Sequence, residues 1–172
     1  MITCYIGIGS NVQRHRHIEA GCRELAMLTD RLRLSSVYEC PSVGFDSHAF
    51  YNLVAELTTT LSLPVLLEKL RDIERRWGRE SNAKKFQDRT LDLDLLLYGE
   101  QVSTEAPVLP RRDIYHYPFV IQPLYELSPQ LLIPGSEQTV QEVWQAMPEL
   151  DSLTLIPLWF SISKSVNPLI RE

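Results

Sequence analysis

Two aspartates, Asp92 and Asp94, alternate with leucines in the run Arg-Thr-Leu-Asp-Leu-Asp that begins at Arg89. In an extended strand, this period of two puts both carboxylates on one face and the leucines on the other. Two residues of strand rise place the carboxylates roughly 6–7 Å apart, close enough to bind one small metal cluster. A pair of like charges is costly to bury without a cation, and Mg²⁺ prefers oxygen ligands and often joins carboxylates to phosphates. The pattern therefore predicts a magnesium site.

The simpler alternative is that Asp92 and Asp94 face solvent on a half-exposed strand. Basic side chains in the polar stretch just before the strand favour the metal hypothesis, and they are Arg79, Lys84, Lys85 and Arg89. Cations beside a carboxylate pair are typical of a site that binds an anion through metal on one side and through arginine or lysine on the other.

Length, charge and cysteine usage limit the classes of protein to consider. A chain of 172 residues suits one domain with a substantial core, and a net charge of −5 argues against a general nucleic-acid binder. The three cysteines form no C-x-x-C pair, so neither a disulfide framework nor a zinc site is indicated. No signal peptide and no membrane-length apolar run is recognisable. A cytoplasmic enzyme with no nucleic-acid or membrane partner fits these observations.

Hydrophobic periodicity predicts the elements that must position the aspartates. Strands are expected at 2–8, 32–38, 50–61, 101–103 and 153–156, and helices at 14–29, 63–78, 139–147 and between Phe119 and Pro129. The run from Leu95 to Tyr98 is apolar on both faces, which predicts a central strand. The loop 40–48 returning into a long strand predicts a hairpin. This β-α-β-β-α-β order suits an α+β fold with a mainly antiparallel sheet flanked by helices.

Several polar residues permit local predictions. Ser10 or Asn11 can cap the first helix, and Thr139 with Glu142 predicts a capping box. His15 and His17 fit a solvated helix face better than a metal site. Glu74, at the end of the second long helix, fits either a nucleotide-side residue or a surface ion pair.

The aspartate run and its continuation Leu-Leu-Leu-Tyr-Gly are similar to the signature of the 6-hydroxymethyl-7,8-dihydropterin pyrophosphokinase (HPPK) family of folate biosynthesis. Further similar stretches follow in the family's order over about residues 1–150. They are Tyr5 to Asn11, Ser36 to Pro41, Gly44, Phe50 to Asn52, Ile73-Glu74, Gly78-Arg79 and Pro118 to Leu124. The resemblance implies a ferredoxin-like core, which we assign to residues 1–157. Residues 158–172 form a C-terminal extension beyond the resemblance, and Trp159 and Phe160 indicate that it docks on the chain itself or on a partner.

The resemblance also implies a reaction and a set of site residues. Pyrophosphate would pass from ATP, the co-substrate, to the hydroxymethyl oxygen of a dihydropterin, with Asp92 and Asp94 holding two Mg²⁺ and acting in catalysis with Arg79 and Arg89. The implied nucleotide-side residues are Glu74, Lys84, Lys85, Arg89, Arg111 and Arg112. The implied pterin-side residues are Cys40, Pro41, Val43, Phe50, Asn52 and Phe119. A flat heterocycle needs aromatic faces for its rings and an amide for its polar edge.

The chain departs from the family pattern in its cationic residues. Arg111 stands where the family usually has histidine, and Tyr117 stands where it commonly has arginine. Ser81 and Lys85 replace loop arginines, and Phe86 replaces a tryptophan. Two alternatives to an active pyrophosphokinase therefore stay open. One is a diverged paralogue with weakened or altered activity, and the other is a non-catalytic binding module with a ferredoxin-like sheet.

Overall fold

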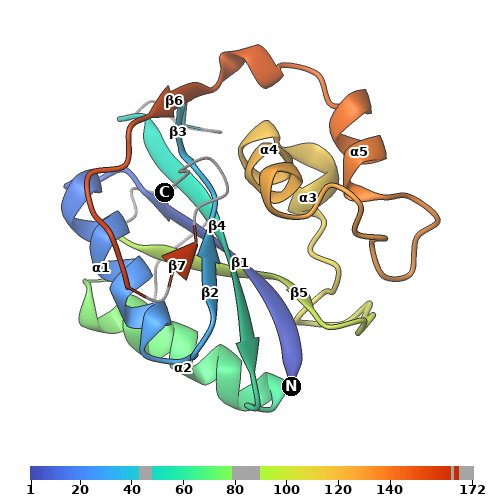
Figure 1. Cartoon of the computed structure of the whole chain (residues 1–172), viewed down its shortest axis with the longest axis horizontal. Helices are drawn as coiled ribbons and strands as arrows, with labels where there is room; N and C mark the ends of the chain where they lie inside the picture. Colours follow the sequence, from blue (N-terminus) through green and yellow to red (C-terminus); the bar gives the residue numbers. More distant parts are fainter. Residues whose placement is uncertain (43–47, 79–89, 164, 167–172) are drawn as a thin grey trace.

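A computed structural model describes residues 1–42, 48–78, 90–163 and 165–166. These residues form a seven-stranded sheet, and five of its strands lie side by side in the order β5-β1-β4-β2-β7 (Figure 1). Strand β3 also pairs with β4, and β6 pairs with the other side of β3. Every pair is antiparallel except β2 with β7. The strands are β1 (Ile2–Ser10), β2 (Leu32–Leu34), β3 (Val37–Cys40), β4 (Phe50–Thr59), β5 (Asp92–Tyr98), β6 (Thr154–Ile156) and β7 (Ser165–Val166).

Helices cover both faces of the sheet. The first face carries α1 (Arg14–Ala26) and α2 (Leu63–Arg76), and the second carries α3 (Asp113–His116), α4 (Pro118–Leu127) and α5 (Val140–Ala146) (Figure 1). A single 3₁₀ turn, η1 (Leu150–Ser152), precedes β6. The order β1-α1-β2/β3-β4-α2-β5 and the strand arrangement form a ferredoxin-like α+β core, as predicted.

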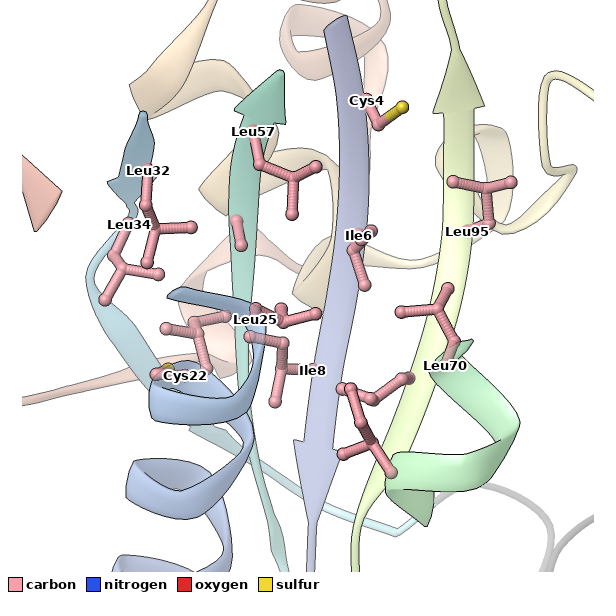
Figure 2. Close-up of a cluster of buried hydrophobic side chains, with 14 of the residues drawn as sticks. Cys4, Ile6, Ile8, Cys22, Leu25, Leu32, Leu34, Leu57, Leu70 and Leu95 are labelled. Carbon is pink, nitrogen blue, oxygen red and sulfur yellow. The ribbon is translucent and has the colours of Figure 1, made fainter. Parts of the chain in front are cut away.

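The main core lies between the sheet and the first helical pair. Figure 2 shows Ile6 and Ile8 of β1 and Leu95 of β5 gathered with Leu25 of α1 and Leu70 of α2. Each of these side chains is at least 95% buried. Burying a leucine or isoleucine contributes roughly 1.5–3 kcal/mol, so this layer holds the strands that carry the candidate site.

A β-bulge explains the leucine run of β5. Tyr5 pairs with Leu97 and Ile6 with Leu95, so Leu96 is the extra residue. The bulge resets the alternation, so Leu96 and Leu97 both pack in the second core, whereas Leu93 and Leu95 pack in the first. The predicted central strand is wrong, because β5 is an edge strand in the part of the chain that the structure describes. It is apolar on both faces because helices cover both.

The bounds of several other predicted elements differ in the structure. The single strand at 32–38 is two strands. Ser35 N donates to the Val54 carbonyl at 2.9 Å, but Val54 N donates to the Ser35 hydroxyl rather than to its carbonyl, and Ser36 N donates to Glu126 at 3.0 Å. Helix α1 ends at Ala26, and its N-cap is Gln13 rather than Ser10 or Asn11. The strand expected at 101–103 is reduced to an isolated bridge between Ser103 and Leu109.

Several local predictions are confirmed. Strands β1, β4 and β6, the β3–β4 pairing, helices α2 and α4, and the Thr139–Glu142 capping box lie where they were expected, within a few residues. The solvated face expected for both histidines is wrong for His17, which is buried with Nδ1 2.5 Å from the Val12 carbonyl. His15 stays exposed, although its ring contacts two aromatic side chains.

Among the described residues, no helix combines the length and the apolar character that a bilayer crossing requires. The division of the chain at residue 157 stays a prediction.

Candidate active site

The register of the sheet brings residues from four strands into one row. Asp92 of β5 pairs with Gly9 of β1, Gly9 with Asn52 of β4, and Asn52 with Tyr38 of β3. Directly opposite residues in antiparallel strands project their side chains to the same face. Asp92, Asn52 and Tyr38 therefore share the second face of the sheet, where α4 lies.

The neighbouring row places the second aspartate on that same face. Asp94 pairs with Gly7, and Gly7 with Val54. The two aspartates are thus separated from Asn52 and Val54 only by glycines, which have no side chains. Gly7 and Gly9 therefore leave a strip of backbone without side chains between the carboxylates and β4, which we call the glycine floor. At Gly9 an added Cβ would lie 2.8 Å from Asn52 Oδ1, whereas at Gly7 the nearest atom would be 3.7 Å away.

The two carboxyl groups form a site of concentrated negative charge. Partial burial, the charge of Asp92 and a hydrogen bond between the two side chains raise the pKa of Asp94 well above its ordinary value, and Arg111 opposes this rise. The Asp94 side chain keeps 32% of its surface exposed, so a ligand can reach it. A cation between the carboxyls would relieve their repulsion.

Among the described residues, Arg111 places a positive charge beside Asp94. Its Nη2 lies 3.6 Å from Asp94 Oδ1, and its Nε donates to Asp113 Oδ2 at 3.1 Å. The backbone amide of Arg111 donates to Leu96 O at 2.9 Å, which fixes the arginine beside β5. Desolvation lowers the pKa of Arg111, but Asp94 and Asp113 outweigh it and raise the pKa overall. The arginine that replaces the family's usual histidine is therefore placed next to the predicted metal ligands.

A groove of about 590 Å³ runs along the outer edge of β5. Helix α2 forms one wall, and the segments 106–108 and 111–113 form the other. Four arginines line it together with Asp94, and they are Arg71, Arg75, Arg111 and Arg112. A groove with this charge suits a polyphosphate, since guanidinium groups bind phosphate oxygens in pairs.

Glu74 also lines this groove. It is 6% exposed, and its Oε2 accepts a 2.9 Å hydrogen bond from the backbone amide of Leu93. The surface position that one of the two alternatives required is therefore wrong. Leu93 stands between the two aspartates, so Glu74 holds the strand at the point where both are presented.

The predicted pterin-side residues gather on the same face of the sheet, beyond the glycine floor. Cys40 pairs with Phe50 and is 4% exposed, and its Sγ lies 2.9 Å from Asn52 Nδ2. Burial raises the pKa of Cys40 to about 12, so this thiol stays protonated and the Asn52 amide has a weak acceptor there. Pro41 follows β3 and is exposed.

Phe119 comes from the helical layer above this face. It lies in the first turn of α4 and stacks on Tyr117, with ring centroids 4.9 Å apart and planes 18° from parallel. Tyr117, which stands where the family commonly has arginine, therefore adds a second aromatic ring to that of Phe119.

Polar contacts fix α4 to the sheet. Tyr38 OH donates to Glu126 and accepts from Gln122 Nε2 at 3.3 Å, and Trp144 Nε1 of α5 donates to Gln122 at 2.6 Å. Burial and the Glu126 hydrogen bond raise the pKa of Tyr38, so it stays a donor. Through this network, the layer that carries Phe119 is held over the row that carries Asn52.

Five predicted site residues lie outside the described residues, and they are Arg79, Val43, Lys84, Lys85 and Arg89. The same holds for the departures at Ser81 and Phe86.

The residues present fit Mg²⁺. Within the described ranges no group of three or more His, Cys, Asp or Glu side chains could hold a metal. Asp92 and Asp94 offer two carboxylates. This number suits Mg²⁺, which is usually bound by one or two carboxylates and completes its coordination shell with water and substrate phosphates.

Sequence analysis missed four residues of this site. Gly7 and Gly9 lie in the stretch from Tyr5 to Asn11 that resembles the family, but no role was assigned to them, although glycines two apart in a strand leave two gaps on one face. Arg71 and Arg75 lie on either side of Glu74 in α2 and line the groove. Their i, i+4 spacing puts both on one side of the helix, and this spacing was the signal that could have identified them.

Comparisons with known proteins agree with this geometry. The family model described as "7,8-dihydro-6-hydroxymethylpterin-pyrophosphokinase (HPPK)" matches residues 5–129. A protein of Haemophilus influenzae named 2-amino-4-hydroxy-6-hydroxymethyldihydropteridine pyrophosphokinase is 35% identical over 150 residues, which are 84% of this chain and 93% of the relative. A Bacillus subtilis protein of the same name is 34% identical over 157 residues, covering 86% of this chain and 93% of the relative.

Solved structures share the fold. A Plasmodium falciparum HPPK-DHPS structure superposes with a TM-score of 0.67 at 12% identity, over 88% of this chain and 46% of that chain. A second, titled "HPPK-DHPS in complex with substrates", has a TM-score of 0.65 at 9% identity, over 84% of this chain and 43% of that chain. This chain thus spans less than half of those longer chains. From the sequence relatives, the chain belongs to the 7,8-dihydro-6-hydroxymethylpterin-pyrophosphokinase (HPPK) family.

Proposed function

We propose that the chain transfers pyrophosphate from ATP to the hydroxymethyl group of 6-hydroxymethyl-7,8-dihydropterin in folate biosynthesis. The hydroxymethyl oxygen forms a bond to the β-phosphorus, and the bond from that phosphorus to the α,β-bridging oxygen breaks. AMP leaves, and the hydroxyl proton passes to solvent. The observation that carries this proposal is the single row of Asp92, Gly9 and Asn52, which joins the carboxylate pair to the predicted pterin side.

The chain's own residues contribute positioning and charge. The groove arginines, with Arg111 foremost, would bind the phosphates of ATP, and Arg79, Arg89, Lys84 and Lys85 are proposed to complete the cationic clamp. Asn52 would hydrogen-bond the polar edge of the pterin, and Phe50 and Phe119 would contact its faces, beside Cys40, Pro41 and Val43. Holding the two reactants at a fixed separation is the main source of rate when little covalent work falls to the protein.

Asp92 and Asp94 are proposed to hold two Mg²⁺ ions. When bound, Mg²⁺ neutralises phosphate charge and supports the charge that develops on transfer. The raised pKa of Asp94 supports this role, because two neighbouring carboxyls without a cation repel one another.

The proposed substrates are small molecules, and the proposal includes no nucleic-acid or membrane partner. A cytoplasmic location, expected from composition, stays part of this proposal.

The decisive experiment measures AMP release from ATP with 6-hydroxymethyl-7,8-dihydropterin and Mg²⁺. We expect Asp92→Asn and Asp94→Asn each to lower the rate about 10²–10³-fold, since each removes a charge that acts on the transferred group. Asp151→Asn, an exposed aspartate in η1, is the matched control and should keep the wild-type rate. Wild-type protein that binds the pterin yet releases no AMP would instead favour the diverged paralogue. A protein in which Mg²⁺ does not tighten the binding of an ATP analogue would favour the binding module.

A further inference from the structure

The segment after β6 makes a contact that the proposed reaction does not explain. The chain leaves β6, passes α1 and then forms β7 beside β2 (Figure 1). Along this path the indole Nε1 of Trp159 donates to the His15 carbonyl at 3.1 Å, and the Trp159 and His15 rings lie 4.5 Å apart. The segment therefore docks on its own chain, at the start of α1.

Trp159 reaches one residue of β4 in particular. Its ring centroid is 5.9 Å from that of Tyr51, and His15 meets the same tyrosine edge-on at 5.2 Å. The Arg14 guanidinium lies 3.9 Å above the Tyr51 ring. Tyr51 is consequently 5% exposed, although it stands close to the end of its strand.

Tyr51 stands between two predicted pterin-side residues. Phe50 and Asn52 flank it in β4, and alternation along a strand sends their side chains to the opposite face. Whatever fixes the Tyr51 ring on one face therefore fixes the backbone that presents Phe50 and Asn52 on the other. The candidate site uses one face of β4, and the Trp159 cluster holds the reverse face of the same residues.

The same cluster ties the two strands of the hairpin together. Arg14 Nη1 donates to Glu39 of β3 at 2.8 Å and to the Ala49 carbonyl, just before β4, at 3.1 Å. Glu39 precedes Cys40, the buried residue opposite Phe50. The start of α1, held between Trp159 and Tyr51, thus spans both sides of the hairpin behind the predicted pterin pocket.

We propose that Trp159 is a positioning residue for the dihydropterin half of the site, acting through Tyr51 on Phe50 and Asn52. This inference rests on the proposed function, since it assigns a task within that reaction. It predicts an asymmetry between the two substrates, because the groove runs along α2 and the edge strand β5, whereas Trp159 contacts α1 and Tyr51 of β4, and β1 lies between β5 and β4. Loss of the indole should weaken pterin binding and leave ATP binding unchanged.

The test compares full-length wild type, Trp159→Ala, Trp159→Phe and Leu155→Ala. Leu155 lies in β6, just before this segment, is 57% exposed and serves as the matched control. The measurements are kcat, the KM of each substrate, the calorimetric Kd of the pterin and the melting temperature. Trp159→Ala should raise the pterin KM and Kd about three- to tenfold, the worth of an aromatic contact, with kcat and the ATP KM unchanged. Trp159→Phe keeps a ring but loses the bond to His15, so it should recover most of the affinity.

An unchanged pterin KM in Trp159→Ala, or equal increases in both KM values, overturns this inference. Should Trp159→Ala not fold, Trp159→Leu, which keeps apolar volume but has no ring, takes its place, and an unchanged pterin KM in that variant overturns the inference. A wild type that neither binds the dihydropterin nor releases AMP with it overturns the proposed function and this inference together. An active wild type with constants insensitive to Trp159 overturns this inference alone.

Discussion

Glu74 Oε2 of α2 accepts a 2.9 Å hydrogen bond from the backbone amide of Leu93, the residue between Asp92 and Asp94. Strand β5 is at the edge of the described sheet, so its outward amides have no strand partner. A buried carboxylate on α2 takes the place of a neighbouring strand at this one position. The helix thereby sets the position of the segment that presents both predicted metal ligands.

Replacing Glu74 should therefore affect stability and metal binding together. Glu74→Leu fills the same space but leaves the Leu93 amide without an acceptor, which should cost about 1–3 kcal/mol of unfolding free energy. The Mg²⁺ concentration for half-maximal activity should rise as well, whereas Glu74→Gln keeps an acceptor oxygen and should be milder. Urea unfolding and Mg²⁺ titration measure both effects. Glu68→Leu, on the exposed side of α2, is the control, and equal behaviour of the two leucine variants would contradict the assigned role.

The groove arginines should govern the affinity for ATP. Removing Arg111 should raise the ATP KM about tenfold or more, since a charge-assisted hydrogen bond is worth roughly 1.5–3 kcal/mol. Arg71→Ala and Arg75→Ala should have smaller effects of the same kind, and Arg75 also pairs with Asp72 at 2.9 Å. The KM of each substrate is the measurement. Arg23→Ala is the control, because Arg23 pairs with Glu19 on α1 and does not line the groove. An ATP KM that responds equally to Arg23→Ala would reject this assignment.

The two floor glycines should tolerate alanine differently. At Gly9 the new methyl group would lie 2.8 Å from Asn52 Oδ1, which forces the amide to move. We expect Gly9→Ala to weaken pterin binding about tenfold, the effect of misplacing one hydrogen-bonding group in a fitted site. Gly7→Ala meets its nearest atom at 3.7 Å, an ordinary contact, and should change the pterin Kd much less. Isothermal calorimetry with the dihydropterin distinguishes the two variants, and similar Kd values in both would remove Asn52 from the pterin site.

Buried thiols should make the protein sensitive to alkali. Burial raises the pKa of Cys4 from its ordinary value of 9.0 to about 12. Between these values the unfolded chain has lost the thiol proton and the folded chain has kept it, so stability falls as pH rises, by about 1.4 kcal/mol per pH unit for this group. Stability is unaffected by this thiol below the unfolded pKa.

Urea unfolding between about pH 9 and about pH 11 measures this slope. Cys4→Ala removes the titrating group and should give a shallower decline, from a lower starting stability because it leaves a small cavity. Thr3→Ala, at the exposed neighbouring position, should keep the wild-type slope. Parallel declines in wild type and Cys4→Ala would show that this thiol does not control the alkaline limit.

Much of the fold followed from local patterns. Alternation predicted β1, β4 and the shared face of Asp92 and Asp94, and the Thr139–Glu142 spacing predicted a capping box that the structure contains. These features depend on neighbours within a few residues, which the sequence displays directly. The bulge at Leu96 and the break at Ser35 depend on partners in other strands, so the same local pattern predicted uninterrupted elements.

The sequence by itself determined the chemistry that the chain can offer: two carboxylates on one face of a strand, arginines and lysines nearby, and a family signature around them. The tertiary structure alone decided what surrounds that chemistry. It placed Gly7 and Gly9 between the aspartates and Asn52, turned Glu74 inward to Leu93, added Arg71 and Arg75 to the groove, and set Trp159 behind Tyr51. Each of these relationships joins residues far apart in the chain, and strand register and helix packing set such distances, not sequence spacing.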